Sequence, residues 1–335
     1  MKKEVRGVIF TLAGGCLWGL SGSCGQYLFT NYQVNSSWLT VVRMLVAGVS
    51  LVLFALLRQR DKAIGIWKVK GDAVQQVVFA LGGLMFCQYA YLTAISYSNA
   101  ATATVLQYLG PVLIMLLVCA VHRRLPNLRE GAAVILAVLG TFLLATHGNI
   151  ATMVLSEQGF TWGMLAAVSL MCYTLLPDRI IPKWGSIVVT GYGMLIGGIV
   201  LALLVQVWKI PVSLDLKGWL AVGGVAVLGT LVAYTMYLQG VADVGPVHAS
   251  MLSSIEPVSA TLCSVFWLHT SFQPIDLVGF LCILATIFLL RRRKGSRSGP
   301  CQTNKGEIWC GLLSATSQRT CLARLKYGRK RKTSG

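Results

Sequence analysis

The sequence is poor in charged residues. Only 12% of its 335 residues are Asp, Glu, Lys or Arg, whereas a soluble domain carries about 25%. Hydrophobic residues make up 55% of the chain, and the mean hydropathy is +0.68. These values exclude an ordinary soluble domain and predict a polytopic membrane protein.

The chain also lacks the motifs of metal, nucleotide and hydrolase sites. Its 4 histidines show no His-x-x-x-His or acid–His spacing. No Gly-x-Ser-x-Gly or phosphate-binding loop is present. Of the 10 cysteines, most lie inside apolar runs, where free cysteine behaves as a small apolar residue. We therefore expect no metal, no cofactor and no nucleotide hydrolysis.

The positive net charge is unevenly distributed. A net charge of +18 ordinarily suggests a nucleic-acid partner. Residues 291–335, however, hold 13 of the 29 Lys and Arg residues. We predict no nucleic-acid partner and a disordered, basic cytoplasmic tail over 295–335, for which contact with anionic lipid is an alternative role.

Apolar segments long enough to cross a bilayer recur along the chain, since a spanning helix needs about 20 residues. The sequence predicts ten transmembrane helices, at about 7–29, 36–57, 74–95, 100–121, 128–147, 159–177, 186–206, 216–238, 247–268 and 274–290. Asp72 with Gln75 and Asn127 with Glu130 fit the capping-box pattern of helix starts. The first run is longer than the apolar core of a signal peptide, so we expect it to be retained.

Basic residues in the loops predict the orientation of the chain. With the N-terminus inside, the external loops carry only Lys209 and Lys217. The cytoplasmic segments before the tail carry Lys2, Lys3, Arg6, Arg58, Arg60, Lys62, Lys68, Lys70, Arg123, Arg124, Arg129, Arg179 and Lys183. Both termini are therefore expected in the cytoplasm.

The two halves of the sequence resemble each other. Pro257 follows Pro111 by 146 residues, and the same offset pairs Tyr91-Leu92 with Tyr237-Leu238. Internal similarity of this kind indicates a duplication. We predict a first repeat of five helices over 1–148 and a second over 149–294. An odd number of spans per repeat makes the second repeat insert upside down, an arrangement that transporters use around a central site.

Glu256 is the strongest candidate for a functional residue. A carboxylate inside an apolar span is costly and should face a cavity or a partner. Ser253 shares its helical face. We interpret Glu256 as a substrate contact or proton-coupling site, with a structural, hydrogen-bonded acid as the alternative.

Pro111 and Pro257 should interrupt their helices. Proline clashes with the carbonyl four residues earlier, here those of Gln107 and Ser253. Irregular backbone at membrane depth is tolerated where it lines a wet cavity or is buried in protein. We predict exposed carbonyls at these two residues, with a simple packing kink as the alternative.

Further polar and aromatic residues lie within the predicted spans. Arg43 can contact an anionic group, pair with Glu256 or extend to the outer interface. The spacing of three residues places two pairs each on one helical face, and these pairs are Gln88 with Tyr91 and Tyr234 with Tyr237. Together with Trp18 they can bind a small solute, or serve packing and interfacial anchoring.

Several short motifs resemble those of the EamA family of the drug/metabolite transporter superfamily. They include Trp18-Gly19, Arg43-Met44-Leu45, Leu109-Gly110-Pro111-Val112 and the run from Leu252 to Val258. Their order over about residues 7–290 is more specific than any one of them. The resemblance implies an inner-membrane transporter with an inverted-repeat fold and a central cavity bounded by helices other than the fifth and tenth.

The sequence thus predicts an all-α secondary carrier of the plasma (inner) membrane rather than an enzyme. We expect it to move a small organic metabolite, such as an amino acid, by alternating access, with export as the expected direction and Glu256 as the candidate for proton coupling. An intramembrane enzyme that acts on lipid and a sensor or assembly subunit are the alternatives. Neither substrate nor oligomeric state follows from the sequence.

Overall fold

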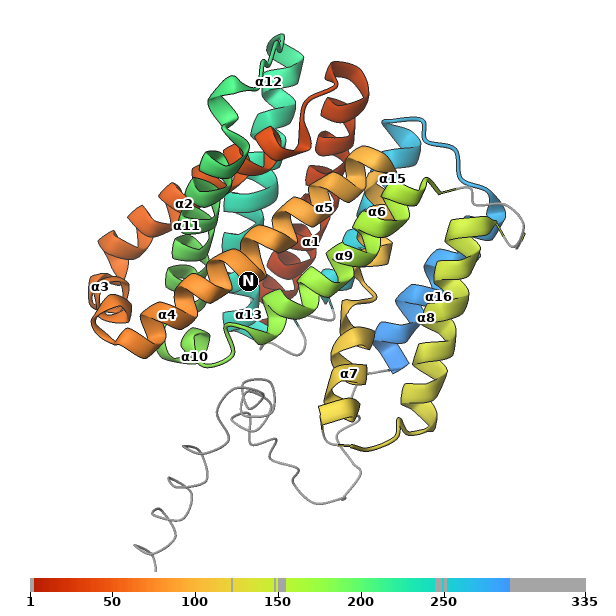
Figure 1. The fold of residues 1–335 in the computed structure, drawn as a ribbon, viewed down its shortest axis with the longest axis horizontal. Coiled ribbons are helices and arrows are strands. Elements are labelled where there is room, and N and C mark those ends of the chain that lie inside the picture. Colours follow the sequence, from red (N-terminus) through yellow and green to blue (C-terminus); the bar gives the residue numbers. More distant parts are fainter. Residues whose placement is uncertain are drawn as a thin grey trace, which may run out of the picture.

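The computed structural model describes residues 3–121, 123–147, 149, 155–244, 249 and 252–289. All regular elements within these ranges are helical. The predicted tail over 295–335 and residues 247, 248, 250 and 251 of the predicted ninth span lie outside the described residues. Figure 1 shows the arrangement of the helices.

The helices of the first half are joined by short connections. Their bounds are α1 Lys3–Tyr32, α2 Ser36–Arg58, α3 Arg60–Lys68, α4 Lys70–Val78, the π-helix η1 Phe79–Met85, α5 Phe86–Tyr97, α6 Ala100–Gln107, α7 Gly110–Val121 and α8 Leu128–Thr146. Segments α4, η1 and α5 follow one another without a break and form one long helix.

The second half repeats much of this series. Its elements are α9 Glu157–Leu175, α10 Ile180–Trp184, α11 Ser186–Val205, the short 3₁₀ turn η2 Val207–Lys209, α12 Leu216–Gly223, the π-helix η3 Gly224–Val232, α13 Ala233–Val244, the 3₁₀ turn η4 Ser253–Ile255, α15 Glu256–Phe266 and α16 Pro274–Leu289. Here α12, η3 and α13 form the long helix.

Seven helices within the described residues are long and apolar enough to cross a membrane. They are Lys3–Tyr32, Ser36–Arg58, Lys70–Tyr97, Ala100–Val121, Leu128–Thr146, Ser186–Val205 and Leu216–Val241. A shorter apolar helix covers Pro274–Thr286. The described part of the chain is therefore all-helical, with several helices able to span a membrane. The sequence predicts ten spans, which is more than these long apolar helices and the shorter one together. The additional predicted spans are the less apolar α9 and the segment that contains α15.

Local sequence signals explain several helix ends. Asn127 accepts hydrogen bonds from the N–H groups of Arg129 and Glu130, and the Glu130 side chain accepts one from the Asn127 N–H, so the predicted capping box is present. The matching prediction for Asp72 is wrong. Helix α4 begins at Lys70, and the Asp72 carboxylate instead accepts bonds from Lys183 and from the Trp184 indole, at 2.8 Å for the indole.

The first helix of each half packs against helices of the other half, and the partners are equivalent in the two cases. Helix α1 packs against η3, α13 and α15, whereas α9, at the same place in the second half, packs against η1, α5, α6 and α7. Two further pairs join like with like: α2 with α11 and α8 with α16. These pairs lie on opposite sides of the molecule, with α8 and α16 on the right in Figure 1.

The two π-helices occupy equivalent positions. The offset of 146 residues maps Phe79–Met85 onto 225–231, which lies inside Gly224–Val232. A π-helix changes which side chains face a neighbour, and such segments are frequent at functional sites. The π-helix η1 packs against α11, and η3 packs against α2. Both halves therefore share an irregularity that composition does not reveal.

Both proline segments are interrupted at matching places. Helix α6 ends at Gln107, residues 108 and 109 form a turn, and α7 begins at Gly110. In the second half the 3₁₀ turn η4 leads into α15, which starts at Glu256 with Pro257 in its first turn. Proline is well tolerated in a first turn because the missing N–H has no helical partner there. In the second interruption, the Ser253 carbonyl accepts hydrogen bonds from the backbone N–H of Glu256 and from the Tyr108 hydroxyl.

Candidate functional site

The two helix interruptions meet through Tyr108. Its hydroxyl lies 3.2 Å from Oε2 of Glu256 and 3.3 Å from the carbonyl oxygen of Ser253. Tyr108 belongs to the turn between α6 and α7, so a residue of the first half contacts the carboxyl and backbone of the second. Tyr108 is not among the residues predicted from the sequence. Its position inside the interruption, three residues before Pro111, was the available signal.

Arg43 is held in the interior by the opposite half. The residue is 5% exposed, so its side chain does not extend to the outer interface. Nε of Arg43 donates to Oγ1 of Thr230 at 2.9 Å, and Oγ1 of Thr230 donates to the carbonyl of Val225 within η3 at 2.9 Å. Nη1 of Arg43 is buried without a hydrogen-bond partner among the described residues.

Arg43 and Glu256 form no ion pair in the part of the chain that the structure describes. A buried charge without an opposite charge or full hydrogen bonding is costly. Each side chain has instead a hydroxyl partner from the other half, Thr230 for Arg43 and Tyr108 for Glu256. The arrangement thus leaves both charged groups able to accept a better partner.

Aromatic rings lie on α1 and α13. The ring of Trp18 lies 5.2 Å from that of Tyr234 and 5.1 Å from that of Tyr237, between centroids. Tyr173 of α9 lies next to Tyr234. Tyr173 was also missed in the sequence, because its neighbours in α9 are mostly apolar. Rings with a hydroxyl group offer both stacking and hydrogen bonding to a solute.

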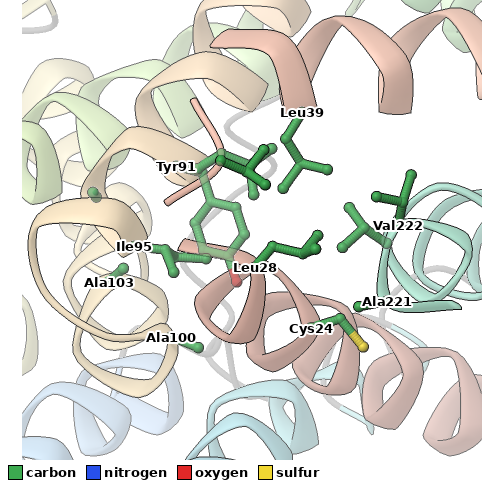
Figure 2. Close-up of a cluster of buried hydrophobic side chains, with 13 residues drawn as sticks. Cys24, Leu28, Leu39, Tyr91, Ile95, Ala100, Ala103, Ala221 and Val222 are labelled. Atoms are coloured by element: carbon green, nitrogen blue, oxygen red, sulfur yellow. The ribbon is translucent and has the colours of Figure 1, made fainter. Parts of the chain in front are cut away.

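The remaining predicted residues lie on the first-half side of this region. Nε2 of Gln107 approaches Sγ of Cys87 at 3.6 Å, and Gln88 is 6% exposed. The hydroxyl of Tyr91 shares a hydrogen bond of 2.8 Å with Oγ1 of Thr104. Figure 2 shows the Tyr91 ring among Leu28, Leu39 and Ile95, a cluster of buried apolar side chains. This placement fits Tyr91 to packing more than to solute binding.

A glycine sets how closely α1 approaches the Glu256 segment. A Cβ atom on Gly19 would lie 2.6 Å from the backbone nitrogen of Ala260 and 2.7 Å from the carbonyl oxygen of Glu256. Both distances are shorter than van der Waals contact allows. Small residues let membrane helices approach in this way, and α1 here touches the backbone that carries Glu256. The region contains no cluster of three or more metal-ligating side chains among the described residues.

Comparison with known proteins identifies the family. The model of the EamA-like transporter family matches the chain twice, over residues 5–146 and 158–292. The chain belongs to the EamA-like transporter family. The resemblance seen in the sequence motifs is thereby confirmed. Two matches in one chain also indicate repeated halves.

Individual relatives of the EamA-like protein agree with this assignment. It is 35% identical over 285 residues to the inner membrane transporter YicL of Salmonella typhimurium, and the match covers 85% of this chain and 95% of YicL. It is 23% identical over 286 residues to the transporter YwfM of Bacillus subtilis, with 84% and 92% coverage. A solved crystal structure shares the fold, with a TM-score of 0.56, 19% identity, and coverage of 86% of this chain and 97% of that one. The protein is thus a membrane transporter and not an enzyme, which sets aside the lipid-processing alternative.

Proposed function

We propose that this EamA-like protein is a secondary carrier that exports a small organic metabolite, such as an amino acid or a related solute, by alternating access. Glu256 and Arg43 provide the charged contacts, and Glu256 is the candidate for proton coupling. Trp18, Tyr234 and Tyr237 contact the body of the solute. Gln88, Gln107 and the backbone carbonyl of Ser253 add polar contacts from both halves.

The observation that carries this proposal is the meeting of two helix interruptions at Tyr108 and Glu256. Transporters place substrate sites near the midplane, where discontinuous helices from two repeats meet. Glu256 and Tyr108 are both half-buried and keep accessible surface. We therefore propose that the solute binds beside this hydrogen-bonded pair.

The proposed architecture is ten helices in two inverted repeats, 1–148 and 149–294, followed by a cytoplasmic basic tail over 295–335. The reciprocal packing of α1 and α9 and the matched π-helices and interruptions support a pseudo-twofold relation. The distribution of Lys and Arg supports cytoplasmic termini. The match to YicL supports placement in an inner membrane.

The proposal is tested with purified protein in proteoliposomes. A screen of amino acids and related solutes should give at least one that the protein exchanges across the bilayer. With that solute, Glu256→Gln should abolish transport or make it independent of an imposed pH gradient, with normal expression. Glu157→Gln, at an exposed first turn of α9, is the matched control and should retain coupled transport. Full, gradient-dependent activity of Glu256→Gln would refute the coupling role.

A further inference from the structure

Gln26 joins three segments at the end of the molecule where α1 ends and α6 begins. Its Nε2 donates to Oγ1 of Thr270 at 3.0 Å. Its Oε1 accepts from the backbone N–H of Ala100 at 2.9 Å and from Oγ of Ser264 at 3.3 Å. Gln26 is 9% exposed. We call these three hydrogen bonds the Gln26 bridge.

The Gln26 bridge connects two groups of helices. Gln26 lies on α1 and Ser264 on α15, and these helices pack closely together. Ala100 begins α6, which packs against α9 and, at this closed end, also against α1 and α15. Of the three bonds, the one to Ala100 therefore links the group built around α1 with the group built around α9. The other two fix the Gln26 side chain within its own group.

The same end is also closed by apolar packing. Leu28 of α1, Tyr91 and Ile95 of α5, and Ala100 and Ala103 of α6 belong to one buried cluster, which extends to Val222 of α12. Figure 2 shows these side chains gathered between the helices. Within this apolar setting, the N–H of Ala100 is at the first turn of α6 and has no partner inside its helix. An apolar residue in place of Gln26 would leave that N–H buried and unpaired, which is unfavourable.

At the opposite end of the molecule, the residues equivalent to Gln26 and Ala100 cannot form the same hydrogen bond. The offset of 146 residues maps Gln26 onto Cys172 and Ala100 onto Pro246. A thiol is only a weak hydrogen-bonding group, and proline has no backbone N–H. The amide bridge therefore belongs to one of the two ends related by the repeat. Of the two pairs of positions related by this offset, only Gln26 and Ala100 have the amide and the backbone N–H that this bond requires.

We propose that Gln26 is a gating residue, which holds the end containing Ala100, Ser264 and Thr270 closed and biases the carrier toward the state closed there. This inference rests on the proposed alternating-access function, in which the two groups of helices move relative to each other. With cytoplasmic termini, the closed end faces the outside.

Distances between spin labels test the proposal on the full-length protein in lipid nanodiscs. One pair of labels, on encoded non-natural residues at Gln158 and Lys217, reports the bridged end, since both positions are exposed and lie at the starts of α9 and α12. A second pair at Lys3 and Thr174 reports the other end. Gln26→Leu should raise the ratio of long to short 158–217 distances about tenfold, or ~1.4 kcal/mol, while the 3–174 distances shorten.

Two further variants separate the bridge from general effects. Gln76→Leu removes another buried glutamine, whose Nε2 donates to the Val189 carbonyl at 2.9 Å between α4 and α11, and it should leave the 158–217 distances unchanged. Thr270→Val removes one bond of the bridge and should produce a smaller shift in the same direction. It also provides a test should Gln26→Leu fail to fold.

The outcomes distinguish this inference from the proposed function. Unchanged 158–217 distances in folded Gln26→Leu or in Thr270→Val, or an equal shift in Gln76→Leu, would overturn the gating role even if the protein transports a solute. Failure of every solute in the transport screen would instead count against the proposed function, while the label distances, which need no solute, still report on the bridge.

Discussion

Gly19 provides a quantitative test of the contact between α1 and the segment that carries Glu256. In Gly19→Ala the new Cβ would lie 2.6 Å from the Ala260 nitrogen, 2.7 Å from the Glu256 carbonyl oxygen and 2.8 Å from Cβ of Ser259. Two of these three atoms belong to the backbone of α15, so they cannot move without shifting the helix. Overpacking of a well-packed interior costs about 1–3 kcal/mol. We expect destabilisation of this order, together with reduced transport.

The control for this prediction is a helical glycine that has open space around it, Gly223. A Cβ on Gly223, at the end of α12, would meet no atom within 4 Å. Alanine is favoured over glycine inside a helix by about 0.5–1 kcal/mol. Gly223→Ala should therefore be neutral or stabilising, the opposite sign from Gly19→Ala. Thermal unfolding in detergent, followed by tryptophan fluorescence, measures both. Equal melting temperatures for Gly19→Ala and the wild type would show that α1 does not press against α15 as described.

Two further predictions concern the Tyr108 hydroxyl and the Arg6–Asp243 ion pair. Tyr108→Phe removes a hydroxyl bond to a charged group worth about 1.5–3 kcal/mol and should slow transport roughly 12- to 140-fold without loss of folding. An unchanged initial rate in proteoliposomes would contradict its role at Glu256. Arg6 binds Asp243 through Nε and Nη2 at 2.8 and 2.9 Å and holds the pKa of that carboxyl below its usual value. The stabilisation is thus present above the unfolded-state pKa and is lost as the pH falls through the lower folded-state pKa. Asp243→Asn should melt below the wild type at pH 7, and the difference should shrink under acid conditions below about pH 4; a gap that stays constant with pH would exclude this ion pair as its cause.

Much of the helical framework follows from the sequence because apolar runs and local caps determine it. The predicted segment 36–57 corresponds to α2 at Ser36–Arg58, and the apolar run that starts at Pro274 is helix α16. Such features depend on neighbouring residues only. The Asp72 prediction failed for the opposite reason, since Lys183 and Trp184, more than 100 positions away, bind its carboxylate.

The candidate site was only partly accessible from the sequence. Glu256 and Arg43 could be selected because charge is costly inside a membrane span. Their partners Tyr108 and Thr230 could not, because the contacts cross from one half to the other, with 148 and 187 positions between the residues in each pair. The π-helix that carries Thr230 has no compositional signal either. Pairing of side chains between halves depends on how the helices pack, which local pattern does not specify.

The hydrogen bonds that Arg43 and Glu256 each make with the opposite half suggest how the proposed carrier binds and releases its solute. Each charged group contacts a neutral hydroxyl of the other half rather than its opposite charge. A direct ion pair between them would have to be broken by every solute, and breaking a buried pair is costly. A hydroxyl bond to a charged group is worth only about 1.5–3 kcal/mol, and Nη1 of Arg43 has no hydrogen-bond partner among the described residues. We infer that a solute bearing both charges replaces these contacts at modest cost, and that its departure restores them. Each hydroxyl and the charge it contacts belong to different halves. In the proposed alternating-access carrier, the same exchange of contacts would therefore connect solute binding to the relative position of the halves.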